Sequence, residues 1–217
     1  MERTISWSVY GAAFVLSIVM FIIGIYVGHV IDLSSQNAIS TSITDLSQKM
    51  STVQLIMLAD SNATSFCPLY LSQLKSIDSD IEKVGYQLSY FEDIKKVTDN
   101  ELKKQYFILE AQSYLLSKKV KSLCNDRSVL LVNFYSNSNC ANCKAQGEQI
   151  LQARDELLGK NIKVKLFSFD GDLGSPVADA LKTQYGITKY PSIVINDSVY
   201  SGYHDKSALE KLIVDAK

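Results

Sequence analysis

The chain has 217 residues, and its 22 Lys and Arg side chains nearly balance its 23 Asp and Glu side chains, for a formal net charge of −1. This balance excludes the general basic field with which a protein holds nucleic acid, and a content of 47% hydrophobic residues excludes a disordered or collagen-like chain. The length predicts one or two folded units besides any targeting segment. The 4 cysteines are too few for a disulfide-scaffolded miniprotein, so each is interpreted from its position.

The N-terminal segment Trp7–Ile31 contains no Asp, Glu, Lys or Arg, and as a helix it is long enough to cross a hydrocarbon core of about 30 Å. We expect an uncleaved signal anchor, because a signal peptide has a shorter apolar centre and a small-residue cleavage site. Arg3 precedes the segment, whereas Asp32 and Asp45 follow it. This charge bias predicts a single-pass cell-membrane protein with residues 7–31 in the lipid bilayer, a cytoplasmic N-terminus and an extracytoplasmic remainder.

Residues 34–126 have the hydrophobic period of packed helices. Apart from one interruption at Ser113, the apolar positions are spaced alternately by four and three residues: Ile39, Ile43, Leu46, Met50, Val53 and Met57, then Tyr70, Leu74, Ile77, Ile81, Val84, Leu88 and Phe91, then Leu102, Tyr106, Leu109, Leu116, Val120 and Leu123. They predict an all-α stalk of three helices with coiled-coil-like seams, buried against one another or, alternatively, against a partner. Turns are expected at Asp60–Asn62 and Val97–Asn100, the second with a capping box of Thr98 and Glu101.

Cys67 and Cys124 lie at nearly equal distances from the second predicted turn, so an antiparallel helical hairpin would bring them side by side. Pro68 suits the first position of a helix, which makes Cys67 its cap. We expect a structural disulfide that closes the open end of the hairpin, and such a bond persists in an oxidising compartment. Two alternatives remain open: a second redox couple that passes electrons to the C-terminal cysteines, and two free thiols.

Beyond Ser128, strands and helices alternate. The expected elements are a strand at Val129–Tyr135, a helix over 144–158, a strand at Ile162–Phe169, a helix at Ser175–Tyr185, a hairpin of Ser192–Ile195 and Ser198–Tyr203, and a final helix at Ser207–Ala216. The first strand is a continuous apolar run, as in sheets that are covered on both faces. Residues 127–217 are therefore predicted to form a small α/β domain with helices on both faces of its sheet.

The motif Cys140-Ala141-Asn142-Cys143 lies between the first strand of this domain and the following helix. Unpaired N–H groups at a helix start stabilise a thiolate, so Cys140 is the predicted nucleophile. Cys143, one turn later, is the predicted resolving thiol that attacks the mixed disulfide. A zinc half-site or an inert disulfide is the competing interpretation, but no second C-x-x-C or neighbouring His completes a zinc site. We predict no metal and no cofactor.

Residues 128–217 resemble the thioredoxin-like family. The resemblance is carried by Val132-Asn133-Phe134-Tyr135 before the C-x-x-C, by Tyr185-Gly186-Ile187 followed by Tyr190-Pro191-Ser192, by the hairpin that ends at Gly202, and by the closing helix with Leu209 and Ile213. It implies that Pro191 is cis and packs beside the two cysteines, and that the backbone of Tyr190 pairs with an extended substrate segment. The substrate-binding residues implied are therefore Tyr190 and Pro191.

The sequence departs from the family at the cysteines. Asn139 stands where thioredoxins have Trp, Ala141-Asn142 replaces Gly-Pro, and one residue is added before the motif. Asn133 occupies the position of a buried Asp that assists proton transfer, and an amide cannot accept that proton as a carboxylate does. Other candidate proton carriers, each weaker than a solvent-exposed or structural interpretation, are Glu148, Asp170 and His204.

Together, the apolar N-terminal segment and the resemblance predict a membrane-anchored thiol–disulfide oxidoreductase that exchanges disulfides with cysteine-containing exported proteins and is recharged by a redox partner. The direction of electron flow is left open. The alternative from another class is a structural or assembly factor that binds protein through the helical stalk and the thioredoxin fold without redox turnover. A third is a chaperone-like binder that uses the groove at Tyr190 and Pro191.

Overall fold

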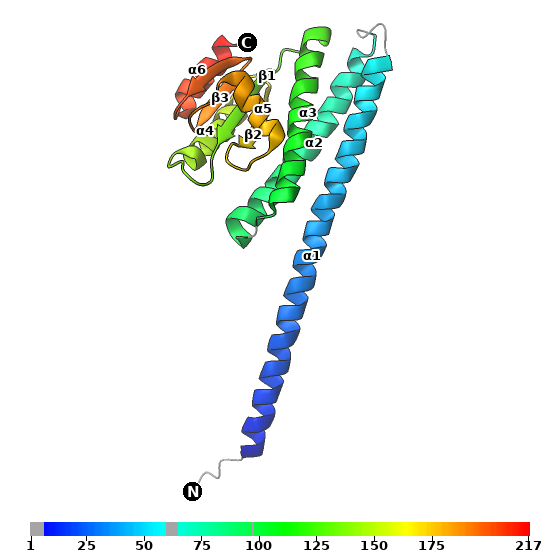
Figure 1. The fold of residues 1–217 in the computed structure, drawn as a ribbon, viewed down its shortest axis with the longest axis vertical. Helices are drawn as coiled ribbons and strands as arrows, with labels where there is room; N and C mark the ends of the chain where they lie inside the picture. Colours follow the sequence, from blue (N-terminus) through cyan, green and yellow to red (C-terminus); the bar gives the residue numbers. More distant parts are fainter. Residues whose placement is uncertain (1–6, 60–64, 97) are drawn as a thin grey trace. The chain divides into compact units, whose positions relative to one another are not determined.

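The computed structural model describes residues 7–59, 65–96 and 98–217 (Figure 1). Its elements are α1 (Trp7–Ala59), α2 (Cys67–Tyr90), the π-helical segment η1 (Phe91–Lys95), α3 (Asn100–Cys124), β1 (Val129–Tyr135), α4 (Cys143–Gly159), β2 (Val164–Asp170), α5 (Pro176–Tyr185), β3 (Ser192–Ile195), β4 (Ser198–Ser201) and α6 (Lys206–Asp215). The chain divides into two compact units, Met1–Ser42 and Ile43–Lys217. The turn expected at Asp60–Asn62 lies outside the described residues.

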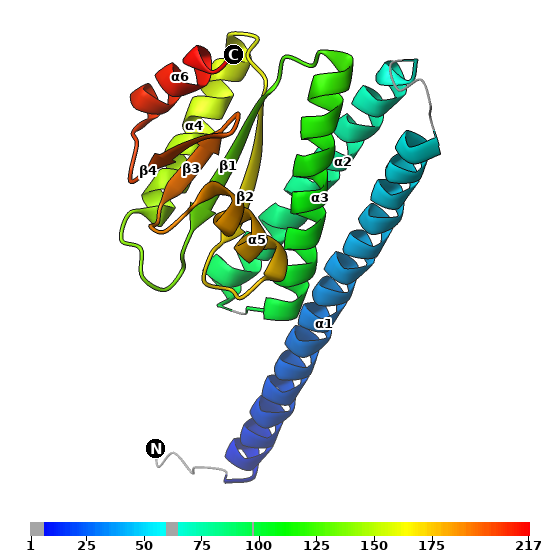
Figure 2. The ribbon, with the colours of Figure 1, turned by 45° about the horizontal axis from the view of Figure 1, so that its top comes forward.

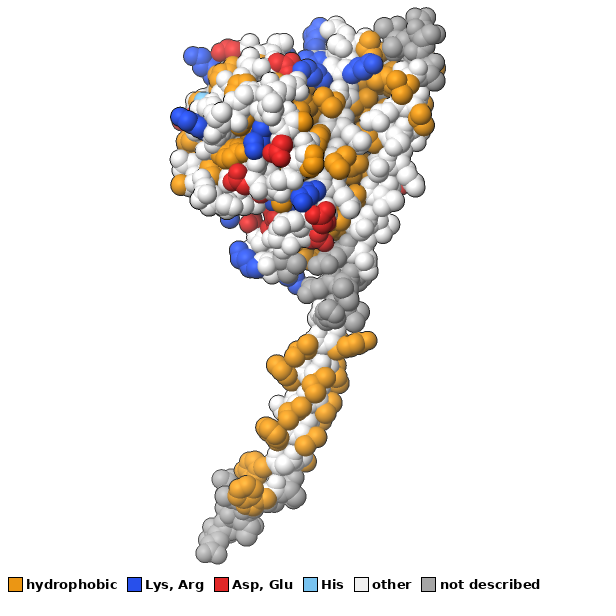
Figure 3. Space-filling view, in the orientation of Figure 1, with side chains coloured by type: hydrophobic (Ala, Val, Ile, Leu, Met, Phe, Trp, Pro, Cys, Tyr) orange, Lys and Arg blue, Asp and Glu red, His pale blue; other side chains and the backbone are white. Residues whose placement is uncertain are grey.

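The first unit consists of the N-terminal part of α1. Its segment Tyr10–Gly28 is long and apolar enough to cross a membrane. The large apolar side chains of this segment are exposed, and they appear as orange side chains along the helix (Figure 3). A membrane anchor and a signal sequence near the N-terminus both fit this observation.

The second unit begins with the remainder of α1 and the hairpin of α2 and α3. The buried apolar residues of α1 and α2 follow the spacing of four and three: Ile43, Leu46, Met50, Val53 and Met57 on α1, and Tyr70, Leu74, Ile77, Ile81 and Val84 on α2. This spacing keeps one face of each helix in contact with its neighbours. The exposed side of α2 carries polar residues such as Ser79, Glu82 and Lys83, together with the exposed rings of Tyr86 and Tyr90.

Two predicted helix caps are wrong by one residue. The capping box of Thr98 and Glu101 is replaced by Asp99, whose carboxylate accepts a hydrogen bond of 3.0 Å from the N–H of Leu102. Aspartate caps a helix start at least as well as threonine, so the neighbouring residue takes the role. Cys67 is likewise the first residue of α2 rather than its cap.

The sheet has four strands in the order β2-β1-β3-β4, with β1 parallel to β2 and β3 antiparallel to both β1 and β4. Alternate residues of β1 enter two cores. Leu130, Val132 and Phe134 pack with residues of α3 and α5, whereas Val129 and Leu131 pack with residues of α4 and α6. Figure 2 shows these two pairs of helices on opposite sides of the strands. The prediction of an α/β domain with helices on both faces of a small sheet is confirmed.

Helix α3 belongs to the core of the sheet although it precedes the boundary predicted between residues 126 and 127. Phe107, Ala111 and Tyr114 of α3 are buried in the same core as Phe167 and Phe169 of β2. The ring centroids of Phe107 and Phe169 are 5.4 Å apart, and those of Tyr114 and Phe167 are 5.3 Å apart. Edge contacts of this kind stabilise a core beyond simple burial.

The outer strand β2 is covered by polar contacts from the α2–α3 hairpin. The Lys165 ammonium lies 2.8 Å from the Asp78 carboxylate and 3.0 Å from the Ser117 hydroxyl. The N–H of Ser168 donates to the Glu110 carboxyl at 2.8 Å. An unpaired strand edge invites pairing with other chains, so this hairpin protects the sheet as well as extending its core.

Candidate active site

The two C-terminal cysteines lie at the end of the connection from β1 to α4. Their sulfurs are bonded at 2.03 Å, with Cα atoms 5.4 Å apart. Cys140 is half-buried, whereas Cys143 is only 6% exposed. Cys140 precedes α4 by three residues, because Ala141 and Asn142 form a turn and the helix begins at Cys143. A thiolate from another molecule therefore reaches the Cys140 sulfur more readily than the Cys143 sulfur.

Ser136 joins the loop before Cys140 to the buried sulfur. Its N–H donates to Cys143 Sγ at 3.4 Å. Its hydroxyl accepts hydrogen bonds of 3.1 Å from the N–H groups of Ser138 and Asn139, and it donates to the Asp172 carboxylate. One side chain thus fixes the loop that leads from β1 to the cysteines.

Pro191 lies at the same end of the strands as the cysteines. Phe134 is paired with Ser192, so Pro191 is next to the end of β1 from which the loop to Cys140 starts. The Tyr190–Pro191 peptide bond is cis, as the resemblance implies. The carbonyl of Pro191 accepts a hydrogen bond of 2.8 Å from the N–H of Gly202.

The side chain of Tyr190 is engaged within the protein. A Cβ atom at Gly171 would overlap the Tyr190 hydroxyl and ring, so a larger residue there would have to displace the ring. The Lys182 ammonium lies 5.7 Å from the centre of the Tyr190 ring and donates to the Gly171 carbonyl at 2.6 Å. Contact with the Tyr190 hydroxyl raises the pKa of Lys182. The Tyr190 ring is therefore held by contacts within the protein.

The candidate proton carriers are held in different places. Asn133 is 4% exposed, and its Oδ1 has no hydrogen-bond partner within the described residues. Asp170 is buried and paired with the Lys103 ammonium at 3.4 Å, while the His204 ring nitrogen Nδ1 lies 3.0 Å from the Gly202 carbonyl. Glu148 is exposed on α4. Asp170 and His204 are therefore both held by contacts within the protein.

Cys67 and Cys124 are joined by a disulfide, with Cα atoms 5.5 Å apart. It closes the end of the α2–α3 hairpin opposite η1. The active-site end of the sheet faces the other end of α3, where Lys103 contacts Asp170. Lys103 and Cys124 are separated by nearly the full length of α3, about 30 Å of helix at 1.5 Å per residue.

The sequence analysis missed the buried charges around α3. Lys103 is 5% exposed and lies 2.7 Å from the Glu92 carboxylate as well as 3.4 Å from that of Asp170. Glu110 is 3% exposed, and burial raises its pKa to about 8, against the opposing effects of the Ser168 N–H and the Tyr106 hydroxyl. Nothing in the sequence distinguishes these two residues from charges on a solvated helix face. The pairing of Ser136 with Asp172 could have been predicted more easily from the sequence, since the two residues follow neighbouring parallel strands.

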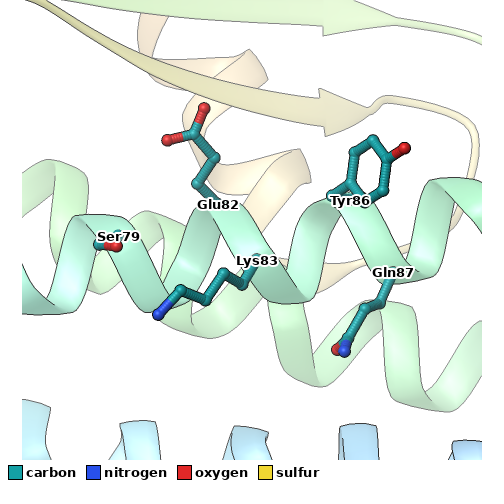
Figure 4. A pocket seen from close by; sticks show the side chains of 5 residues that line it. All are labelled: Ser79, Glu82, Lys83, Tyr86 and Gln87. Atoms are coloured by element: carbon teal, nitrogen blue, oxygen red, sulfur yellow. The ribbon is translucent and has the colours of Figure 1, made fainter.

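A shallow hollow lies on α2, away from the cysteines. Its lining residues are Ser79, Glu82, Lys83, Tyr86 and Gln87, and Figure 4 shows Glu82 and Tyr86 pointing to one side of the helix and Lys83 and Gln87 to the other. Glu82 is paired with Arg154 at 2.9 Å, and Lys83 with Asp80 at 3.2 Å. These are surface ion pairs rather than reactive groups. Among the residues that the structure describes, no cluster of His, Cys, Asp and Glu is suited to a metal ion.

No family model and no curated protein matches the sequence. Solved structures do match a segment of it. Chloroplastic thioredoxin z is 18% identical, with 46% of this chain and 88% of that chain covered and a TM-score of 0.36. Fasciola hepatica thioredoxin is also 18% identical, with coverage of 48% and 93% and a TM-score of 0.36, and human ERp44 is 24% identical, with coverage of 42% and 28% and a TM-score of 0.34.

These neighbours are thioredoxin-like proteins. Each match covers less than half of this chain. A fold hosts many functions, so the chemistry has to be inferred from the cysteine site itself.

Proposed function

We propose that this chain is a membrane-anchored thiol–disulfide oxidoreductase that exchanges disulfides with exported proteins through Cys140 and Cys143. The observation that carries the proposal is the unequal exposure of the bonded pair, half-buried at Cys140 and 6% exposed at Cys143. An accessible sulfur next to a shielded one gives an attacking thiolate a single target. The cis Pro191, at the same end of the strands as the cysteines, supports binding of the substrate segment beside the disulfide.

The exchange follows from this arrangement. A substrate thiolate attacks Cys140 Sγ, the bond to Cys143 breaks, and its electron pair leaves on Cys143 Sγ, where the Ser136 N–H stabilises the charge. In an oxidising cycle a second substrate thiol then attacks the mixed disulfide, which leaves the substrate oxidised and Cys140 reduced. The same steps in reverse reduce a substrate disulfide. A separate redox partner must restore the starting state of the pair in either direction.

The proposed location rests on two features outside the active site. The apolar segment Tyr10–Gly28 supports a membrane anchor, and the bias between Arg3 and the acidic residues Asp32 and Asp45 supports a cytoplasmic N-terminus. A second disulfide, between Cys67 and Cys124, supports an oxidising compartment for the rest of the chain.

The proposed domains are an anchor at 1–33, a helical stalk at 34–126 and a thioredoxin-like domain at 127–217. Helix α3 serves both of the last two, since it pairs with α2 and also fills one core of the sheet. The proposed role of the Cys67–Cys124 bond is structural. About 30 Å of helix separates it from the end of α3 that reaches the active-site edge, which is too far for direct exchange with Cys140.

Trapping of mixed disulfides tests the proposed function. In a Cys143→Ser variant of the full-length protein, Cys140 should stay attached to substrate proteins, because no thiol remains to release them. The matched Cys140→Ser variant should trap none. Equal trapping by the two variants would contradict the assignment of Cys140 as the attacked sulfur.

A second candidate, protein binding without redox turnover, is favoured by the exposed apolar side chains near the tip of the hairpin. Tyr86 is 76% exposed, Tyr90 45% and Ile94 65%. Apolar groups that gather on one surface often mark a protein contact. A binder of this kind would retain its partners when Cys140 and Cys143 are both replaced by serine, whereas the oxidoreductase would lose them.

A further inference from the structure

Ser136, in the loop between β1 and Cys140, has a buried side chain that forms several hydrogen bonds. Its hydroxyl takes part in three hydrogen bonds, from the N–H groups of Ser138 and Asn139 and to the carboxylate of Asp172. The residue is 3% exposed. A buried hydroxyl that is satisfied on all sides holds its surroundings in one arrangement.

Asp172 is itself fixed to the end of the sheet. It follows β2, and its N–H donates to the Asp170 carboxylate at 3.1 Å. The N–H of Gly171 donates to the carbonyl of Tyr135, the last residue of β1, at 2.8 Å. The turn after β2 is thereby tied to the strand from which Ser136 emerges, so the Asp172 carboxylate is a fixed acceptor for the Ser136 hydroxyl.

The contacts continue into the helical hairpin. The Lys103 ammonium of α3 is buried between the carboxylates of Asp170, at 3.4 Å, and Glu92, at 2.7 Å, and it lies 5.6 Å from the centre of the Tyr135 ring. A buried ammonium with two carboxylate partners resists displacement, because losing either partner would leave an unpaired charge. The turn that carries Asp172 is therefore held against α3 through the contact between Lys103 and Asp170.

We propose that Ser136 and Asp172 form a positioning pair that directs the Ser136 N–H at Cys143 Sγ during disulfide exchange. This inference rests on the proposed function and adds two residues to it. When the Cys140–Cys143 bond breaks, the electron pair remains on a sulfur that is nearly inaccessible to water, and the N–H at 3.4 Å is the donor beside it. The hydroxyl–carboxylate contact keeps that N–H in place, while neither side chain touches the reacting sulfur.

Loss of the pair should make Cys143 a poorer leaving group. A hydrogen bond to a charged group changes an equilibrium or a rate by roughly 10-fold to 150-fold. A loosened N–H retains part of this effect, so we expect Ser136→Ala to slow reduction of the Cys140–Cys143 bond by about 3-fold to 10-fold. Asp172→Ala should act in the same direction, since it removes the acceptor that orients the hydroxyl.

The test uses the full-length protein in detergent and two readouts. The first is the rate at which dithiothreitol reduces the Cys140–Cys143 bond. The second is the pH profile of Cys143 alkylation in the reduced Cys140→Ser background, which should move to higher pH in Ser136→Ala. Ser138→Ala is the matched control in the same loop, because it keeps the backbone N–H that donates to Ser136. Ser136→Thr retains the hydroxyl and should restore both readouts.

The outcomes separate the two proposals. Equal rates and equal alkylation profiles for Ser136→Ala and Ser138→Ala would overturn the positioning pair. A lower melting temperature of Ser136→Ala with an unchanged alkylation profile would also overturn it, because a purely structural serine explains that result. Alkylation of Cys143 does not depend on turnover. A wild-type protein that fails to exchange disulfides would therefore contradict the proposed function, while the alkylation profiles still decide on Ser136 and Asp172.

Discussion

Replacing both Cys67 and Cys124 with serine should lower stability without slowing exchange at the active site. The two cysteines are 57 positions apart, and closing a loop of this length restricts the unfolded chain by about 4 kcal/mol in the chain-entropy model. For a folded unit of this size, 1 kcal/mol corresponds to about 2–4 °C in melting temperature. The double variant should therefore melt roughly 10 °C lower than wild type.

The two quantities should be measured on the same full-length preparation. Melting followed by circular dichroism reports the stability of the folded unit, and reduction of a model disulfide in the presence of dithiothreitol reports Cys140 and Cys143. We expect the exchange rate below the melting transition to stay within about 2-fold of wild type, since the hairpin disulfide acts chiefly on the unfolded ensemble. The single variants are a useful comparison, because each leaves one free thiol.

The competing relay hypothesis predicts the reverse. If electrons reach Cys140 and Cys143 through the first pair, turnover with the native partner in membranes must stop when that pair is removed. A double variant that melts within about 2 °C of wild type but no longer turns over in membranes would refute the structural interpretation. Failure with dithiothreitol as well would instead indicate damage to the active site.

Three further predictions concern other parts of the chain. Glu110→Gln should be more stable than wild type at pH 8, because the Glu110 carboxyl keeps its proton to about pH 8 in the folded protein and loses it near pH 4.5 in the unfolded chain. The free energy of unfolding of wild type should therefore fall between these two pH values, by up to about 5 kcal/mol. Denaturant unfolding at pH 5 and pH 8 measures this fall, and no fall would mean that the buried carboxyl is charged. Gly171→Ala should displace the Tyr190 ring and cost about 1–3 kcal/mol, whereas Gly147→Ala, with open space at its Cβ, should be neutral or stabilising in the same melting assay. Membrane-impermeant maleimide, after impermeant reductant, should label Cys140 in intact cells, and labelling only after lysis would reverse the proposed topology.

The sheet and its helices were predictable because their signals are local and repeated. The apolar run from Val129 to Phe134 has no polar alternation apart from Asn133, and a strand of this kind must be covered on both faces. The pairing of Cys67 with Cys124 followed from their symmetric placement about one turn. Both inferences use only spacing along the chain.

The double role of α3 was not predictable in the same way. The spacing of Leu102, Leu109 and Leu116 is that of a simple helical hairpin. A second apolar face of the same helix, with Phe107 and Tyr114, packs in the core of the sheet. A helix packed on two sides has a weak periodic signal, because its apolar residues surround most of the axis. The assignment therefore needed the tertiary structure.

The candidate site was predictable in part. The cysteine motif and the proline segment have characteristic residue types in a characteristic order, whereas the contacts of Ser136 depend on the conformation of one loop and on a carboxylate from another. Asp172 lies 36 positions from Ser136, so their contact can be inferred only once the two preceding strands are placed side by side. Positions of this kind are set by the arrangement of strands and loops rather than by composition.

The reduction potential of the full-length protein tests the central claim most directly. The protein would be equilibrated with dithiothreitol buffers of graded poise, its thiols trapped with acid and alkylated, and each cysteine pair followed by mass spectrometry. We expect Cys140 and Cys143 to titrate together as a two-electron couple, with the ratio of reduced to oxidised forms changing tenfold per about 30 mV. A Cys140–Cys143 pair that stays oxidised at every poise in the folded protein would contradict the proposal of disulfide exchange.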